Sequence, residues 1–294
     1  MHKSGFVSII GRPNVGKSTL LNAFINQKLS IVSSKPQTTR SNVIGILDNK
    51  NYQIVFTDTP GFHKPKHKLG EYMIKSISNG LNEVDLIIFV VNARKEVLNS
   101  EIEMYEKIKD KKIPKIFVLN KIDERKGEEV FGALEKYSKV MDFDEYVPIS
   151  ALNGKNLDTL LEVILKYLPE GPKYYEDDQT ATNHEKFFVS EIVREKILKL
   201  VRDEIPHGVG VEILSMKYDE KHKRYNIEGN IFCEKDTHKP IIIGRDGEML
   251  KKISTYSRQE IERFLGSKVY IRLWVKVRKN WRDDNNYLKS LGYK

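Results

Sequence analysis

The sequence predicts two domains, an α/β domain built on a doubly wound, mostly parallel sheet and a smaller α+β domain after it. Through residue 168, short and nearly continuous apolar runs alternate with longer helical patterns, as in sheets whose strands are buried on both faces. After the Pro-Glu-Gly-Pro segment at 169–172 the pattern changes: strands with alternating polar and apolar residues now lie between helical segments. We therefore divide the chain into a first domain at 1–170, a linker at 171–185, a second domain at 186–280 and a basic C-terminal tail at 281–294.

Five apolar runs predict the strands of the first domain. Each is rich in Ile, Val, Leu and Phe and has the length of a strand. Helical patterns at 17–25 and 157–168 accompany them, and this alternation is that of a doubly wound sheet. The runs are residues 6–10, 52–56, 86–91, 116–119 and 146–149.

The pattern of the second domain predicts the order α-β-β-α-α-β. The first two strands are joined by a polar hexapeptide and are expected to form a hairpin. The last strand alternates large polar or aromatic residues with aliphatic ones, so one of its faces should be buried. In chain order the elements are residues 185–205, 209–218, 225–233, 240–243, 248–265 and 269–277.

Composition excludes several classes of protein. Hydrophobic residues make up 39% and charged residues 31% of the 294 residues, which is ordinary for a globular protein and not for a disordered one. The single cysteine, Cys233, excludes an intrachain disulfide and a Cys-based zinc site. No apolar run approaches the roughly 20 residues of a membrane helix and the N-terminus shows no export signal, so we expect a cytoplasmic protein.

The net charge of +9 is concentrated near one end of the chain. Residues 251–294 hold 12 Lys and Arg against 4 Asp and Glu, and 12 − 4 gives a local charge of +8. Such a concentration indicates a polyanionic partner, although a solvated basic face agrees equally well with the charge alone.

A phosphate-binding loop follows the first apolar run and precedes the first helical pattern. This is the context in which G-x-x-x-x-G-K-[ST] binds nucleotide phosphates. The glycines let backbone N–H groups approach the phosphates, Lys17 reaches the β- and γ-phosphates, and Ser18 offers its hydroxyl to Mg²⁺. The matching residues are Gly11, Arg12, Pro13, Asn14, Val15, Gly16, Lys17 and Ser18.

Two motifs at later strand ends predict which base is bound. Asn-Lys-Ile-Asp follows the run at 116–119, and its Asp can accept hydrogen bonds from guanine N1–H and the 2-amino group, which adenine lacks. Ser-Ala follows the run at 146–149 and can offer a backbone N–H to the guanine carbonyl oxygen. Together with the phosphate-binding loop they predict a site for GTP and GDP. The residues are Asn120, Lys121, Ile122, Asp123, Ser150 and Ala151.

Two further segments predict a switch that responds to the γ-phosphate. Asp58 would hold Mg²⁺ through a water, and the N–H of Gly61 would contact the γ-phosphate. A threonine of the earlier segment can close over Mg²⁺, and we choose Thr39 with Thr38 as the alternative. The predicted Mg²⁺ ligands are thus Ser18, Thr39 and Asp58. The segments comprise Gln37, Thr38, Thr39 and Arg40, and Asp58, Thr59, Pro60, Gly61 and Phe62.

Phe62 takes the position at which many GTPases carry a glutamine that orients the attacking water. A phenylalanine cannot hydrogen-bond a water, so we expect slow intrinsic hydrolysis of GTP. The same side chain can also simply pack near the switch. The His- and Lys-rich residues 63–68 fit either a solvated loop or a contact surface for RNA or protein.

A Gly-x-x-Gly loop lies between the short and the long helix of the second domain. The order α-β-β-α-α-β is that of a type II KH domain, in which this loop closely approaches the sugar-phosphate chain of about four nucleotides. The tetrapeptide is also common as a plain turn. Trp274 and Trp281 lie among basic residues and can stack on bases. The predicted RNA-binding residues are Gly244, Arg245, Asp246, Gly247, Lys251 and Lys252.

Taken together, these motifs resemble the Era family of bacterial GTPases over nearly the whole chain. The joining of a single GTPase domain to a C-terminal type II KH domain makes the resemblance specific. It implies a GTPase that cycles between GTP and GDP forms with Mg²⁺, binds the 3′ end of small-subunit ribosomal RNA and assists assembly of the small ribosomal subunit. It also implies peripheral contact with the inner face of the cell membrane, and we expect a monomer.

Asn14 adds a hypothesis about a second cation. Related GTPases with Asn at this position and no switch glutamine can bind K⁺ near the phosphates, where it supplies the positive charge of an arginine finger. In the alternative interpretation Asn14 only shapes the loop.

Other functions stay open at this point. An RNA chaperone with a mainly structural nucleotide would agree with Phe62. A GTPase of tRNA modification is disfavoured, because no Cys-ended or cofactor-binding segment accompanies the first domain. An ATP-dependent phosphotransferase is disfavoured by Asn120 and Asp123.

Overall fold

The computed structural model describes residues 2–32, 38–61, 65, 67–81, 83–93, 96–176, 185–201, 205–291 and 293. The chain forms two compact units. The first comprises Met1–Ser30, Pro36–Lys64 and Met73–Thr182, and the second comprises Ile31–Lys35, Pro65–Tyr72 and Asn183–Lys294. Two short segments of the N-terminal half therefore group with the C-terminal unit.

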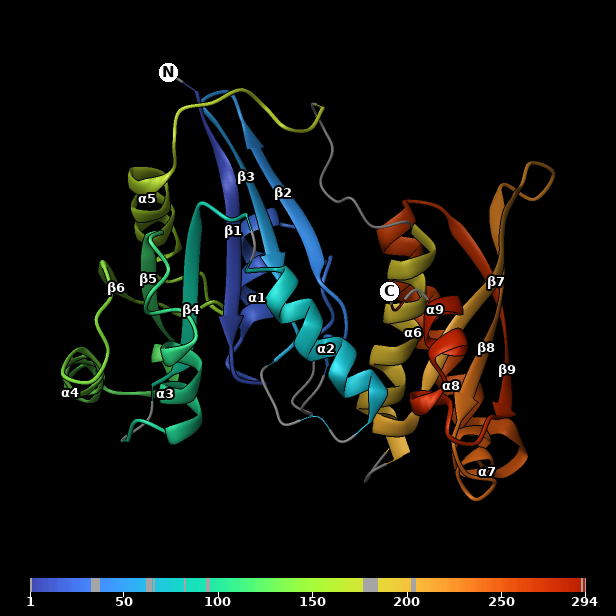
Figure 1. The fold of residues 1–294 in the computed structure, drawn as a ribbon. Helices are drawn as coiled ribbons and strands as arrows, with labels where there is room; N and C mark the ends of the chain where they lie inside the picture. The colour runs from blue at the N-terminus through green and yellow to red at the C-terminus, as the bar shows by residue number, and fades with distance from the viewer. Residues whose placement is uncertain are drawn as a thin grey trace. The chain divides into compact units, whose positions relative to one another are not determined.

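The first unit is built on a six-stranded sheet in the order β2-β3-β1-β4-β5-β6, in which only β2 is antiparallel to its neighbour (Figure 1). The predicted α/β class is confirmed. The strands are β1 (Lys3–Gly11), β2 (Val43–Asn49), β3 (Tyr52–Asp58), β4 (Leu86–Asn92), β5 (Lys115–Asn120) and β6 (Glu145–Pro148). Its helices are α1 (Lys17–Ile25), the part of α2 (Lys68–Asn79) that begins at Met73, α3 (Asn99–Glu106), α4 (Gly127–Ser138) and α5 (Leu157–Tyr167).

The central strands are buried because helices cover the sheet. Phe89 and Phe117 pack in one cluster with residues of α3 and α4, including Met104 and Tyr137. The phosphate-binding loop lies between the end of β1 and the start of α1, so the packed sheet holds it in place. The carboxyl ends of β1, β4 and β5 run in parallel register, which brings the predicted motifs to one edge.

The linker begins later in the structure than the predicted start at residue 171. Gln53 of β3 accepts the backbone N–H groups of Tyr174 and Tyr175 at 2.8 and 2.9 Å, and it donates to the carbonyl of Tyr175 at 3.0 Å. Lys173 forms an ion pair with Asp48 at 2.8 Å. Residues 171–175 are thus fastened to the first unit and do not belong to a free linker.

The second unit contains the predicted α-β-β-α-α-β order. Its three-stranded sheet has the order β7-β8-β9, with β7 and β8 antiparallel and β8 and β9 parallel. The first helix was predicted to end at residue 205, and in the structure it ends at Leu200. The elements are α6 (Glu185–Leu200), β7 (Gly210–Asp219), β8 (Arg224–Cys233), α7 (His238–Ile243), α8 (Glu248–Leu265), β9 (Lys268–Val277) and α9 (Asn285–Ser290), with short 3₁₀ turns η2 (Ile205–Gly208), η3 (Arg245–Gly247) and η4 (Trp281–Asp283).

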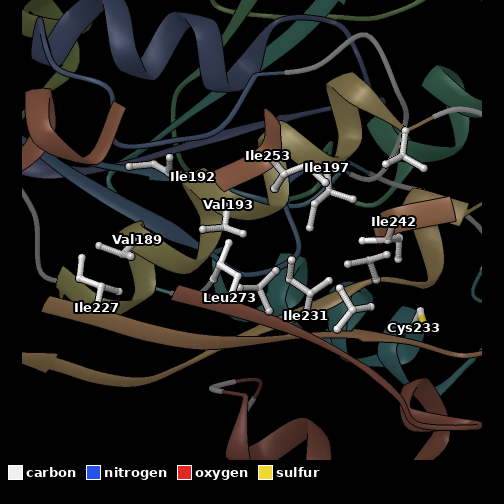
Figure 2. Packing of buried hydrophobic residues seen from close by; sticks show 14 of the residues in the cluster. Val189, Ile192, Val193, Ile197, Ile227, Ile231, Cys233, Ile242, Ile253 and Leu273 are labelled. Carbon is white, nitrogen blue, oxygen red and sulfur yellow. The ribbon is translucent and has the colours of Figure 1, made fainter. Parts of the chain in front are cut away.

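The core of the second unit lies between its helices and one face of the sheet. Figure 2 shows Val189, Val193 and Ile197 of α6 in one cluster with Ile231 of β8 and Leu273 of β9. All five side chains are buried. This packing holds α7 and α8, and with them the Gly-x-x-Gly loop, on the helical side of the sheet.

The segment predicted as a basic tail is instead folded. The Trp281 side chain is fully buried, and its Nε1 donates to the Gly208 carbonyl at 2.9 Å. Asp284 caps α9 by accepting the N–H of Tyr287, whose ring stacks under Arg278 at 3.6 Å. Burial of its apolar side chains orders this segment despite its basic residues. The segment therefore packs against the rest of the second unit.

Candidate nucleotide site and RNA-binding loop

The phosphate-binding loop is enclosed by neighbouring backbone and side chains. A Cβ atom at Gly11 would lie 2.4 Å from the carbonyl oxygen of Val90, and one at Gly16 would lie 2.2 Å from Asn120 Nδ2. Gly16 also has φ +99, which disfavours any other residue. The loop therefore requires glycine at both positions that the motif defines.

Lys17 is held inside the loop by two backbone carbonyls. Its Nζ donates to the oxygens of Gly11 and Arg12, both at 3.0 Å. Burial lowers the pKa of Lys17 to about 8, and the nearby charge of Asp58 opposes this shift. The ammonium group is thus poorly solvated, and a phosphate would be a stronger partner for it than two neutral carbonyls.

The three predicted Mg²⁺ ligands lie together. Ser18 Oγ donates to Asp58 Oδ2 at 2.6 Å, and it lies 3.0 Å from Thr39 Oγ1. Thr39, our first choice over Thr38, therefore belongs to this cluster. Ser30 Oγ donates to the same carboxylate oxygen at 2.8 Å, a contact that no sequence motif indicates.

Asp58 has the surroundings of a cation ligand. Its side chain is fully buried, and this burial raises its pKa despite the opposing charge of Lys17. Its Oδ1 atom is buried without a hydrogen-bond partner among the described residues. A buried carboxylate with an unpaired oxygen beside hydroxyl groups fits Mg²⁺, which prefers oxygen ligands. The residues present thus suit the metal, and their ligand roles stay a prediction.

Asn120 joins the phosphate-binding loop to the Ser-Ala segment. Its Nδ2 donates to the Val15 carbonyl at 2.8 Å, and its Oδ1 accepts the N–H groups of Lys121 at 2.8 Å and Ala151 at 3.0 Å. We predicted that the Ser-Ala segment offers a backbone N–H to guanine, but the N–H of Ala151 is bonded to Asn120. Asn120 is therefore a clamp between two loops, whereas Asp123 is exposed and can face a base.

The second switch segment lies directly against the phosphate-binding loop. A Cβ atom at Gly61 would come within 2.7 Å of the Pro13 nitrogen, so glycine is required at this close approach. Thr59 is buried and donates through Oγ1 to the Ile9 carbonyl at 2.9 Å, which fixes the start of the segment. Phe62 and Gln37 lie outside the described residues.

The Gly-x-x-Gly loop of the second unit has one tight and one open glycine. A Cβ atom at Gly244 would lie 2.7 Å from the backbone nitrogen of Met249, whereas nothing lies within 4 Å of one at Gly247. Both glycines have positive φ, +76 and +79. The exposed side chains around the loop are Arg245, Asp246, Glu248, Lys251 and Lys252. The open side next to Gly247 leaves room for a phosphate at the start of α8.

Comparison with known proteins finds the same two parts. Residues 6–121 match the family model of 50S ribosome-binding GTPases, and residues 204–282 match that of KH domains. GTPase Era of Clostridium botulinum strain Okra is 59% identical over 294 residues, which cover 100% of this chain and 99% of that protein. The chain belongs to the Era family of GTPases. The predicted family and the predicted GTPase activity are therefore confirmed.

Other Era proteins are similar over the full length. GTPase Era of Clostridium novyi is 56% identical and is covered completely. A crystal structure of Era in complex with MgGDPNP and nucleotides 1506–1542 of 16S ribosomal RNA is 41% identical, with a TM-score of 0.96 over 100% of this chain and 99% of that one. A variant of Aquifex aeolicus Era bound to GDP·AlF₄⁻ is 41% identical, with a TM-score of 0.95 over 99% of both chains.

Two other kinds of site are absent from the described residues. No described helix is both long and apolar enough to cross a membrane. No group of three or more His, Cys, Asp and Glu in the described part of the chain is arranged to hold a metal ion.

Proposed function

We propose that this Era-family GTPase is a GTP-dependent switch that binds the 3′ end of small-subunit ribosomal RNA through its KH domain and acts in assembly of the small ribosomal subunit. The observation that carries the proposal is the match, over the whole length of both chains, to an Era structure that contains both MgGDPNP and a 16S ribosomal RNA segment. The enclosed loop at Lys17 and the open loop at Gly247 provide a site for each ligand.

We infer the roles of the nucleotide-site residues from their arrangement. Lys17 would bind the phosphates, while Ser18, Thr39 and Asp58 would hold Mg²⁺, directly or through water. Asp123 would select guanine. A water attacks the γ-phosphate in line, and the positive charges of the site stabilise the transition state without a protein base. Asn14, at the exposed edge of the loop, is the proposed ligand for K⁺.

The division of the chain into units supports coupling between GTP and RNA. Ile31–Lys35 and Pro65–Tyr72 flank the two switch segments in sequence, yet they group with the unit that contains the KH domain. We infer that a switch segment released on loss of the γ-phosphate would change the state of the RNA-binding unit through these neighbouring residues.

Hydrolysis of GTP with and without a short single-stranded RNA tests the proposal. The RNA should match the 3′ end of the ribosomal RNA, and the wild type should be compared in KCl with a double variant, Gly244→Asp and Gly247→Asp. We expect the RNA to stimulate the wild type and not the variant, because two carboxylates would repel phosphate at the loop. Tight RNA binding without any stimulation would show that the KH domain only tethers the GTPase.

We further propose that the protein acts in the cytoplasm as a monomer and contacts the inner membrane surface peripherally, as the family resemblance implies. Size-exclusion chromatography with light scattering tests the monomer. Flotation with vesicles of bacterial phospholipid tests the membrane contact, and a protein that stays at the bottom of the gradient would contradict it.

A further inference from the structure

Strand β9 presents a stripe of cations and aromatic rings on the face opposite the core. Val269, Leu273 and Val275 are buried in the core cluster. Because side chains alternate along a strand, the residues between them point to the other side of the sheet. This outward set is exposed throughout and consists of Lys268, Tyr270, Arg272, Trp274 and Lys276.

The rings of the stripe are accessible and are already flanked by guanidinium groups. Tyr270 is 43% and Trp274 is 39% exposed. The Arg272 guanidinium lies 5.8 Å from the ring centre of Tyr270 and 6.0 Å from that of Trp274. From the neighbouring strand, Arg224 lies 5.0 Å over the Tyr270 ring. Each ring therefore lies next to a positive charge, and Arg224 occupies the space over one face of Tyr270.

The charge of this face favours an anionic occupant. The outward residues of β9 include three cations and no acid. In register on the neighbouring strands, Lys217 and Arg224 add two cations, while Glu212, Asp219 and Glu228 are the acids. The Asp219 carboxylate is hydrogen-bonded to the backbone N–H and to the ring Nδ1 of His222. The excess of positive charge therefore lies along β9.

One end of the face is covered by the chain itself. Phe232 packs against Tyr287 of α9 at 5.2 Å between ring centres, and a Cβ at Gly210 would lie 3.3 Å from Trp281. Tyr270 and Trp274 stay exposed beyond this cover. They are four residues apart, which is about 13 Å along a strand. At this spacing each ring can stack on a different base.

We propose that this outer face of the KH sheet is a second binding surface for single-stranded RNA, in which bases stack on Tyr270 and Trp274 and phosphates contact Arg272 and its neighbouring lysines. It is separate from the Gly-x-x-Gly loop, which lies among the helices on the other side of the sheet. Stacking on aromatic rings of an exposed sheet between cations binds single strands with little sequence preference. The surface would therefore hold RNA on either side of the segment that the KH loop contacts.

Tryptophan fluorescence can observe this surface directly. The chain has two tryptophans, and Trp281 is fully buried, so an RNA base can stack only on Trp274. Oligouridine should be titrated into the full-length protein and into the Gly244→Asp, Gly247→Asp variant, in which the KH loop is blocked. We expect quenching in both proteins, reduced by added salt because phosphate contacts contribute.

Substitutions then separate the surface from the KH loop. In the blocked-loop protein, Tyr270→Ala and Trp274→Ala should each weaken oligouridine binding at least about fivefold, as loss of one stacked base predicts. Trp274→Phe should keep most of the affinity measured by anisotropy while the quenching disappears. Lys139→Gln, which removes an exposed cation of the first unit, is the matched control and should change nothing.

Absence of quenching, or equal affinity of the alanine variants and the blocked-loop parent, would overturn the proposal and leave this face to a protein partner. Far-ultraviolet circular dichroism verifies that each variant is folded, and Arg272→Gln gives a second test that removes no ring. Failure of the KH loop to bind the ribosomal RNA 3′ end would appear as equal affinity of the unblocked and the blocked-loop proteins for that RNA. The two proposals can therefore fail independently.

Discussion

The two glycine loops of the molecule, residues 11–18 and 244–247, both lead into a helix and both are suited to phosphate, but they differ in what surrounds them. In the first, a Cβ at Gly16 would collide with Asn120, and Lys17 is buried between carbonyls. In the second, nothing lies within 4 Å of a Cβ at Gly247, and the side chains between its glycines are exposed.

This difference corresponds to the shape of the ligand. A closed loop whose donors are held in place suits a compact nucleotide whose phosphates must be oriented for reaction. An open loop suits a polymer that enters and leaves on both sides. Glycine thus serves close packing at Gly11, Gly16 and Gly244, whereas at Gly247 it leaves open space.

The largest effect should follow from filling the closed loop. In Gly16→Ala the new Cβ would meet Asn120 Nδ2 at 2.2 Å, at a backbone φ of +99. Displacement of the loop by even 1 Å can cost about a hundredfold in rate, so we expect GTP hydrolysis to fall by at least that factor. Single-turnover hydrolysis measures it.

Gly132→Ala is the matched control, since a Cβ there meets nothing within 4 Å and the residue lies within α4. It should leave hydrolysis unchanged. Wild-type activity in Gly16→Ala would contradict the view that this loop is rigidly enclosed.

The next effect concerns the cation at the exposed edge of the closed loop. If Asn14 binds K⁺, hydrolysis should be about tenfold faster in KCl than in NaCl, because the ion stabilises negative charge in the transition state. Asn14 has φ 64, so Asn14→Gly retains the backbone while removing the ligand and should abolish the salt difference. A variant that slows hydrolysis equally in both salts would instead show that Asn14 only shapes the loop.

Within the open loop, the two glycines should respond differently. Gly244→Ala would place a Cβ 2.7 Å from the Met249 nitrogen, and such overpacking costs about 1–3 kcal/mol of unfolding free energy. Gly247→Ala meets open space and should cost about 1 kcal/mol, since only its positive φ is strained. Urea unfolding of the two variants compares them. Equal losses would show that packing against Met249 does not distinguish them.

The smallest effect lies in the β7–β8 hairpin, away from both loops. Hydrogen bonds from the ring and the backbone N–H of His222 lower the pKa of Asp219 from 3.8 to about 2. Because the folded-state pKa is the lower one, the stabilisation is complete above about pH 3.8 and is lost as the pH falls toward 2. Carboxyl-carbon NMR titration should show this pKa, and His222→Ala should return it toward 3.8.

Much of the fold follows from the sequence, because burial on both faces leaves a clear pattern. The helices at Lys17–Ile25 and Glu248–Leu265 have the bounds that were predicted. Strand β2 (Val43–Asn49) was not predicted, since it is an edge strand that contains a glycine and ends in polar residues. Edge strands owe their conformation to the neighbour with which they pair, and that neighbour is not visible in local sequence.

The site was predictable where a motif requires a residue and not where a single side chain completes a cluster. Ser18, Thr39 and Asp58 come from three motifs and lie together. Ser30 donates to the same carboxylate, but an isolated serine carries no signal in the sequence. The clamp formed by Asn120 was also missed, because its partners lie in two distant loops.

Burial of Trp281 has a consequence for how the protein is made. The indole seals the space next to Gly208 and Gly210, and it lies after the last strand of the KH sheet. During synthesis the first unit can complete its fold while the second is still being translated. Because Trp281 and the helix that follows complete the packing of the RNA-binding unit, we expect a nascent chain to bind nucleotide before it can bind RNA.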